Sequence, residues 1–199
     1  MRRPLAVCVI CAVSVTAHAQ VSTRNPADVR AGAYTLETSH ARIVFSVSHM
    51  GFSTWYGNLT GATGTLTLDP HNPAASSVAI SIPAASISTT NAVLDAKLKG
   101  GSWFDTERYP TITFKSDAVK ITGPGQADIT GALTLRGFTH PVTLHAHFNG
   151  AGTNPLDQAY TVGFDATLAL QRSAFGINTY VPLIGDDVEV AISAPFVAK

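Results

Sequence analysis

The chain has 199 residues, a formal net charge of zero and charged side chains at only 13% of its positions. A chain of this length builds one ordinary domain with its own core. It holds no Lys/Arg-rich run that could follow a phosphate backbone, which excludes nucleic acid as a partner. An average globular domain is about one quarter charged, so Ser, Thr and Asn must cover much of this surface.

The first 19 residues have the order of a secretory signal peptide. Arg2 and Arg3 precede an apolar stretch at residues 5–15, and a small-x-small motif ends at Ala19. We expect cleavage after Ala19 and a periplasmic mature protein. The apolar stretch is too short to cross a bilayer, and no later stretch is long enough, so we expect no membrane-spanning segment in the mature chain.

Both cysteines, Cys8 and Cys11, lie in the segment to be removed. The mature chain is therefore expected to have no disulfide, no thiol nucleophile and no cysteine metal ligand. Residues 20–33 are expected to form an N-terminal extension, and residues 34–199 the folded domain.

From Tyr34 onward, apolar residues alternate with polar or small ones, which is typical of strands with one buried face. In residues 42–50, for example, Ile43, Phe45, Val47 and His49 share one face. About eight such strands follow one another, with turns predicted at 69–73, 123–125 and 136–141. Eight antiparallel strands bury their apolar faces by closing into a barrel, which also removes exposed edges.

One segment breaks this alternation. Across residues 91–104, apolar side chains lie at roughly helical spacing, with Asn91 suited to the N-cap and Gly100-Gly101 to a stop. We expect a short helix that caps one end of the barrel.

The inward-facing positions predict a cavity. An eight-stranded barrel is either filled by its side chains or holds one small ligand. Most inward residues here are large and apolar, but small ones interrupt them. The small inward residues are Gly57, Gly64, Gly131, Ala146, Ala166 and Ala194. They favour an apolar cavity inside the barrel.

Five ordered blocks of the sequence carry a family resemblance. The blocks are 40–52 (HARIVFSVSHMGF), 85–89 (ASIST), 95–114 (DAKLKGGSWFDTERYPTITF), 131–142 (GALTLRGFTHPV) and 172–177 (RSAFGI), the last ahead of 185–188 (GDDV). Together they resemble the YceI family of periplasmic, lipocalin-like polyisoprenoid-binding proteins, over nearly all of the mature chain. The sequence departs from that family at Lys97, where His is common, and at Ala41, where Ser is common.

The resemblance implies an eight-stranded antiparallel lipocalin-like barrel and an elongated tunnel for a long isoprenoid-type lipid, such as a polyprenyl chain or a quinone. It also implies a homodimer in many members, and no cofactor, metal or catalytic activity. Combined with the alternation, it predicts the ligand-binding residues. These are Phe45, Val47, His49, Phe52, Trp55, Phe114, Leu133, Leu144, Phe164, Arg172, Phe175 and Asp186.

Three polar residues each allow two interpretations. His49, near one mouth of the barrel, either hydrogen-bonds a ligand head group or satisfies backbone groups at its turn. Arg172 and Asp186 are both in phase with inward residues, and a buried charge needs a partner. They either form an ion pair that closes the barrel end, or Arg172 offers its planar donors to a phosphate or carbonyl group of the ligand.

Other chemistry has weaker support. His145 and His147 have a spacing that can bind a metal, but the alternation turns them toward solvent. No GxSxG motif accompanies the many hydroxyl side chains, and the close acidic cluster at residues 105–107 is assigned to capping or solubility.

Two alternatives to a lipid carrier stay open at this point. The first is an enzyme that turns over an amphiphile in the barrel, with His49 and Arg172 or Asp186 as acid, base and charge stabiliser. The second is an envelope stress or interaction protein whose interior is packed shut.

Overall fold

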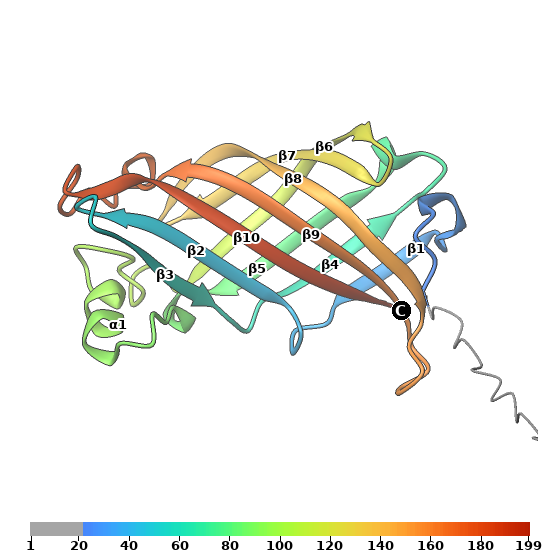
Figure 1. The fold of residues 1–199 in the computed structure, drawn as a ribbon, viewed down its shortest axis with the longest axis horizontal. Helices are drawn as coiled ribbons and strands as arrows, with labels where there is room; N and C mark the ends of the chain where they lie inside the picture. Colours follow the sequence, from blue (N-terminus) through green and yellow to red (C-terminus); the bar gives the residue numbers. More distant parts are fainter. Residues whose placement is uncertain (1–21) are drawn as a thin grey trace, which may run out of the picture.

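The computed structural model describes residues 22–199 and shows a barrel with one short helix beside one end (Figure 1). The predicted signal peptide, residues 1–19, lies outside the described residues. The strands are β1 (Gly32–Leu36), β2 (Arg42–His49), β3 (Ser53–Leu59), β4 (Thr63–Leu68), β5 (Ser77–Pro83), β6 (Thr111–Gly123), β7 (Gln126–Leu135), β8 (Phe138–Thr153), β9 (Tyr160–Gln171) and β10 (Ile184–Ala198). The helix is α1 (Ala92–Lys99), and short 3-10 helices are η1 (Pro26–Asp28), η2 (Pro73–Ala75), η3 (Ala84–Ser86) and η4 (Arg172–Phe175).

The barrel closes because β10 has partners along both edges. One edge pairs with β9, and the other pairs with β2 and then, near the end of β10, with β1. β1 and β2 are therefore two parts of one interrupted wall strand, and β3 and β4 are two parts of the next. Counted in this way, the ten strands form the eight-stranded antiparallel barrel that the sequence predicts.

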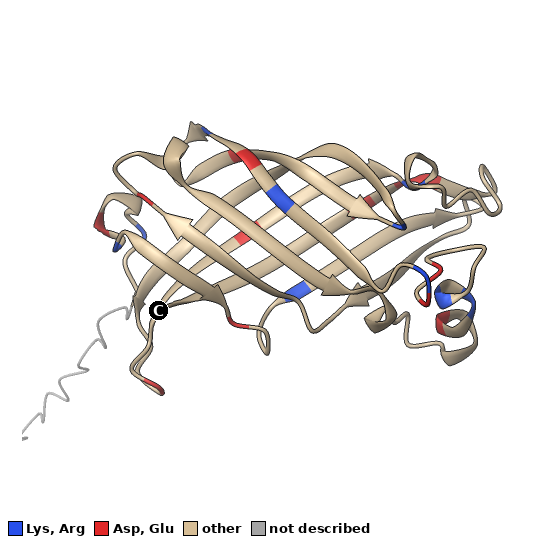
Figure 2. Cartoon of the chain, turned by 180° about the vertical axis from the view of Figure 1, so that it is seen from behind, with Lys and Arg blue, Asp and Glu red and all other residues tan. Residues whose placement is uncertain are grey.

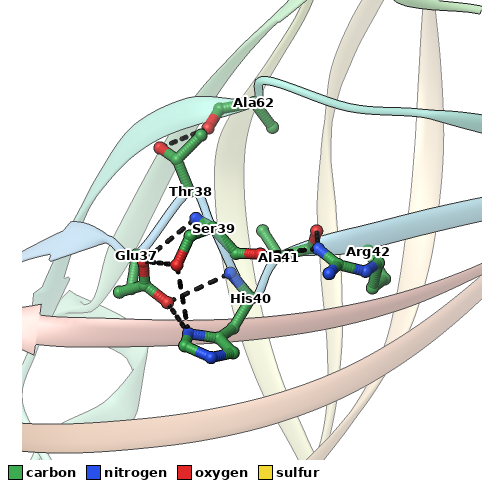
Figure 3. Close-up of polar contacts among 7 residues, drawn as sticks. All are labelled: Glu37, Thr38, Ser39, His40, Ala41, Arg42 and Ala62. Carbon is green, nitrogen blue, oxygen red and sulfur yellow. Dashed lines mark hydrogen bonds and ion pairs between the residues drawn. The ribbon is translucent and has the colours of Figure 1, made fainter.

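A turn held by Glu37 separates β1 from β2 (Figure 3). Its carboxylate accepts hydrogen bonds from the backbone N–H of Ser39 (3.0 Å) and of His40 (3.1 Å), and it also contacts the His40 imidazole. Thr38 donates its hydroxyl to the carbonyl oxygen of Ala62 (2.8 Å), between β3 and β4. The two interruptions are thus bonded to each other, which lets both wall strands bend at the same level.

The helix begins after the predicted N-cap and ends at the predicted glycine pair, before the last apolar residues of the 91–104 segment. The side chain of Asn91 accepts from the N–H groups of Val93 and Leu94 (both 3.1 Å), so the predicted N-cap is confirmed. The prediction that Gly100-Gly101 stops the helix is confirmed, because α1 ends at Lys99 and Gly100 leaves the helical conformation (ψ 169°). The Gly100-Gly101 pair acts as the stop, and the following turn folds back onto the helix.

The connection that contains η3 and α1 lies beside an edge that the barrel strands leave unpaired. β3 pairs with β2 along one edge, while its other edge has one isolated bridge, from Asn58 to Ser88. Residues 84–110 run from β5 to β6 past this edge, at the lower left of Figure 1. The predicted cap therefore covers the side of one mouth as well as its end.

Two interior glycines, Gly57 and Gly131, do not leave the empty space that the sequence analysis predicted for them. A Cβ atom at Gly57 would lie 2.3 Å from Cζ of Phe45 on the paired strand, and one at Gly131 would lie 2.7 Å from Cζ of Phe114. Phenylalanine ring edges therefore already occupy the space beside these glycines. The glycines do not leave gaps; they let the rings extend along the wall, which keeps the barrel axis open.

Two segments lie differently from the sequence expectation. Thr23, in the expected N-terminal extension, forms a backbone bridge with Ala151, and Gly32 already belongs to β1. The turn predicted at 136–141 is shorter, because β8 begins at Phe138 and Pro141 lies within the strand opposite Ala132. Strand pairing extends further at both places than local sequence signals indicate.

Candidate ligand cavity

A cavity of about 960 Å³ runs through the barrel, from the α1 end to the end that carries η1. Ligand pockets in proteins typically measure about 300–1,000 Å³, so this cavity has the size of a large binding site rather than of a packing defect. The alternative of an interior packed shut is therefore wrong.

The wall of the cavity is apolar because strand alternation directs one apolar face of each strand inward. Six of the predicted ligand-binding residues supply apolar side chains to this wall from the strands. These are Phe45, Val47, Phe114, Leu133, Leu144 and Phe164. Ala146 and Ala166 lie opposite each other on β8 and β9 and also line the cavity, so this stretch of wall carries only methyl groups.

Charged side chains are few on the lining formed by residues 22–199, and they are distributed unevenly. Lys97 and Arg172 lie at the α1 end and Asp69 at the opposite end. The Asp69 carboxylate accepts the N–H groups of His71 and Asn72 (both 3.0 Å), so its own turn already engages it. The α1 mouth is thus cationic, and it favours a ligand head group that is anionic or accepts hydrogen bonds.

His49 lies at this mouth. Its imidazole packs against Trp55, with 5.5 Å between ring centroids at a 42° tilt, and both residues line the cavity. Within the described chain, no hydrogen bond occupies its ring nitrogens. The interpretation in which the ring satisfies backbone groups at the turn is therefore wrong.

Arg172 is buried, with 5% of its surface exposed, and its guanidinium is held by backbone oxygens. Its nitrogens donate to the carbonyl oxygens of Gly185, Ile177 and Ile184 (each 2.8 Å) and of Thr179 (3.0 Å). Desolvation by burial lowers the pKa of Arg172 from its ordinary value, and the charge of Asp186 partly opposes this. Two of these acceptors lie in the segment before β10 and two at the start of β10, so the main role of Arg172 is to hold that segment against the strand.

Asp186 accepts hydrogen bonds from a different residue, Ser173. Its carboxylate accepts hydrogen bonds from the backbone N–H of Ser173 (2.8 Å) and from the Ser173 hydroxyl (2.6 Å). No ion pair joins it to Arg172 among residues 22–199, so the predicted salt bridge is wrong. The enzyme alternative loses support as well, because His49, Arg172 and Asp186 each contact separate groups.

Of the twelve predicted ligand-binding residues, nine line the cavity and three do not. Phe52 is 88% exposed at the tip of the β2–β3 hairpin, Phe175 is buried beside the His140 ring, and Asp186 is bonded to Ser173. Phe52 and Phe175 lie past the ends of β2 and β9, where the chain turns, and Asp186 lies in β10 within the register shift between Ile184 and Val188, so period two holds at none of the three.

Several mouth residues escaped the sequence analysis. Leu94, Lys97 and Leu98 line the cavity from one face of α1, and Trp103 and Tyr180 join them from the loops. The i, i+3, i+4 spacing of the three helix residues is the signal that could have identified them. Trp103 and Tyr180 lie outside α1 and the strands, so neither helical spacing nor strand alternation gives their direction.

The two histidines of the predicted surface pair have local partners. His145 is exposed and its Nδ1 lies 2.8 Å from the Asp128 carboxylate, while Nδ1 of His147 lies 3.1 Å from Asn149. Residues 22–199 contain no group of three or more His, Cys, Asp or Glu side chains arranged to hold a metal ion. None of the described helices has the length and apolar character needed to cross a membrane.

Comparison with known proteins identifies relatives at the level of sequence. A family model described as "YceI-like domain" matches residues 34–196. A "UPF0312 protein" of Pseudomonas aeruginosa is 38% identical over 157 residues, which is 79% of this chain and 81% of the relative. One of Ectopseudomonas mendocina is 37% identical over 154 residues, which is 77% of this chain and 80% of the relative.

Solved structures share the fold. The crystal structure of Burkholderia cenocepacia BcnA matches with a TM-score of 0.73 at 24% identity, and covers 80% of this chain and 98% of its own. A polyisoprenoid binding domain from Saccharophagus degradans, implicated in plant cell wall breakdown, matches with a TM-score of 0.65 at 13% identity. It covers 85% of this chain and 100% of its own.

Proposed function

Because the chain belongs to the family of YceI-like domains, we propose that it is a periplasmic carrier that binds a long apolar lipid of isoprenoid type inside its barrel. Polyprenyl chains and quinones are the ligand classes that we expect. The lipid is the cargo, and the proposal includes neither a cofactor nor a catalytic step. The Saccharophagus degradans domain, named for polyisoprenoid binding, supports this ligand class.

The cavity of about 960 Å³ carries the proposal. Contact between water and the apolar wall of such a cavity is unfavourable. An apolar chain that replaces this water removes both its own surface and that of the wall from solvent. Each 100 Å² of apolar surface so buried contributes roughly 2.5 kcal/mol, before the cost of ordering the ligand is subtracted. Such a site selects the length and girth of a ligand more than its chemistry.

The uneven charges support one orientation of the ligand. Lys97 can donate to an anionic or carbonyl-bearing head group at the α1 mouth, and His49, which packs against Trp55, lines the same cavity. Toward the opposite end the polar side chains on the lining, such as Asn25, Ser77 and Gln126, are uncharged, apart from the carboxylate of Asp69, which its own turn engages. The hydrocarbon tail would therefore extend from the α1 mouth toward η1.

Mass spectrometry of lipid extracted from the purified protein tests the proposal. We expect an isoprenoid chain in the extract of the wild-type protein, and its loss from Ala166→Trp, which places an indole in the methyl-lined stretch. Ala169→Trp is the matched control, because Ala169 lies on the same strand but is exposed to solvent. Circular dichroism would check that both variants are folded.

Two results would contradict this function. One is wild-type protein that is purified empty and takes up neither prenyl lipids nor quinones. The other is equal lipid content in the folded Ala166→Trp and Ala169→Trp variants, which would mean that the lipid binds outside the barrel.

A further inference from the structure

Two loops at the α1 end present apolar side chains to solvent. The first is the β2–β3 hairpin, residues 50–52, and the second is residues 178–183, which precede β10. Phe52 is 88% exposed, Tyr180 66% and Leu183 59%, and Met50 and Val181 are exposed as well. We call these two segments the rim loops.

The rim loops form one surface. The backbone N–H of Met50 donates to the carbonyl oxygen of Leu183 (2.8 Å), and His49 pairs with Ile184 directly behind this contact. The Arg172 guanidinium fixes the second loop from inside through the carbonyl of Thr179. The apolar tips are therefore held side by side by the framework of the barrel.

No formal charge interrupts this surface. The chain has no Asp, Glu, Lys or Arg between Arg42 and Asp69, and none between Arg172 and Asp186. In Figure 2 the outermost loops at this end are tan, whereas charged segments lie on the barrel and on α1. Of the two acidic residues that follow the second loop, Asp186 is bonded to Ser173 and Asp187 lies near Gln171.

The surface continues into the cavity. Met50 and Tyr180 belong to the rim loops and also line the cavity, as does Ile184 just behind them. The opposite end of the barrel differs, because its exposed large apolar side chains lie on separate elements, Ile121 near the end of β6 and Leu156 on the β8–β9 loop. Contiguous exposed apolar surface marks an interaction site, and here it surrounds the opening of a lipid-sized cavity.

We infer that the rim loops dock the protein on the surface of a lipid bilayer, with the α1 mouth facing the membrane. The aromatic and aliphatic tips would enter the interfacial layer, where amphipathic rings are favoured. A ligand could then pass between bilayer and barrel without exposing its hydrocarbon to water. This inference rests on the proposed function, since it concerns how the same cavity is loaded.

Charge complementarity favours an anionic bilayer. Lys97 and Lys99 stand in the last turn of α1, and Lys97 lines the mouth itself. The nearby carboxylate of Asp95 is occupied by Ser88 and Thr89. Cations close to a membrane surface are attracted by anionic lipids. A second copy of the chain on the same tips would instead cover the mouth that a carrier must keep accessible.

Sedimentation with vesicles tests the inference. The double variant Phe52→Ser/Leu183→Ser removes two exposed tips, and Leu156→Ser is its matched control, 92% exposed on the β8–β9 loop at the far end. With vesicles of phosphatidylethanolamine and phosphatidylglycerol, we expect wild type and Leu156→Ser to bind equally. The double variant should bind about tenfold or more weakly, because two apolar side chains no longer leave water. Lys97→Gln/Lys99→Gln should reduce the preference for these vesicles over phosphatidylcholine alone.

Uptake of a prenyl lipid from detergent micelles distinguishes membrane docking by the rim loops from lipid binding in the cavity. We expect the double variant to take up micellar lipid as wild type does. Vesicle binding without any lipid uptake would support docking and overturn the carrier function. Equal vesicle binding by the double variant and Leu156→Ser, or no binding by wild type, would overturn docking. A wild-type dimer that the double variant converts to a monomer would also overturn it, in favour of a second copy as the occupant.

Discussion

Two turns of this barrel are each organised by one charged side chain, and they differ in burial. Arg172 donates to four carbonyl oxygens from a buried position, whereas the exposed turn at Glu37 is held by a carboxylate that accepts two backbone N–H groups. Both side chains have lowered pKa values, but the effect on the charged form is opposite for an acid and a base. Burial lowers the pKa of Arg172 and so disfavours its charged form. Hydrogen bonds, first from the Ser39 side chain, lower the pKa of Glu37 to about 2 and so favour its charged form.

The difference shows what each charge does for the fold. A buried cation cannot be removed without stranding its acceptors, so it is required at every pH at which the protein folds. An exposed carboxylate in a turn can be protonated or replaced at small cost, and its contribution depends on pH. Three substitutions test this contrast, in order of decreasing expected effect.

The largest effect is expected for Arg172→Met. The variant leaves four carbonyl oxygens, two before β10 and two at its start, without their donor, and we expect the free energy of unfolding in urea to fall by about 3 kcal/mol or more. Arg42→Met is the control, because Arg42 is exposed and donates to the carbonyls of Ser39 and Ala41. Its loss should cost less than about 1 kcal/mol. Equal losses for the two variants would remove the distinction between buried and exposed turns.

A smaller effect is expected for Asp186→Asn. The substitution removes the charge that accepts from Ser173 and that partly offsets the desolvation of Arg172. We expect a loss of about 1–2 kcal/mol in the same urea measurement. Asp187→Asn is the adjacent control at an exposed site, and it should change stability by less than about 0.5 kcal/mol. A larger loss for Asp187→Asn than for Asp186→Asn would contradict the bonding described.

The smallest effect, and a pH-dependent one, is expected for Glu37→Gln. Folding lowers the pKa of Glu37 from 4.5 to about 2, so its stabilisation is fully present above pH 4.5 and is lost as the pH falls toward 2. Above pH 4.5 the free energy of unfolding of wild type should exceed that of the variant by no more than about 1 kcal/mol. The two free energies should converge as the pH falls toward 2. Thermal unfolding across this range measures the difference. A gap that widens toward low pH would show that the carboxylate does not hold the turn in its charged form.

Strand alternation was enough to predict the barrel and most of its lining, because each wall residue has one of only two directions. The partner of Arg172 could not be predicted in this way. Its acceptors are backbone oxygens of an irregular loop and of the first residues of β10, whose path depends on the closed barrel. An acidic residue in phase, Asp186, was therefore the candidate that the sequence offered. The prediction that Phe52 and Phe175 line the cavity was wrong for a related reason, since each lies beyond the end of a strand.

The interruptions of the first two wall strands were equally hidden. Residues 37–41 and 60–62 carry no strong turn signal of their own, and the bond from Thr38 to Ala62 forms only after both strands are in place. Asn91, in contrast, acts through groups two and three residues away, and its role as N-cap was correctly predicted.

The rings that lie over Gly57 and Gly131 have a consequence for ligand choice. Strand number and stagger fix the diameter of a closed barrel, so relatives of this protein cannot easily widen or narrow the backbone itself. Exchange of a glycine and ring pair, such as Gly57 with Phe45, would alter the bore at one level and leave the hydrogen-bonded wall unchanged. The calibre of the channel could thus evolve, or be engineered, one level at a time.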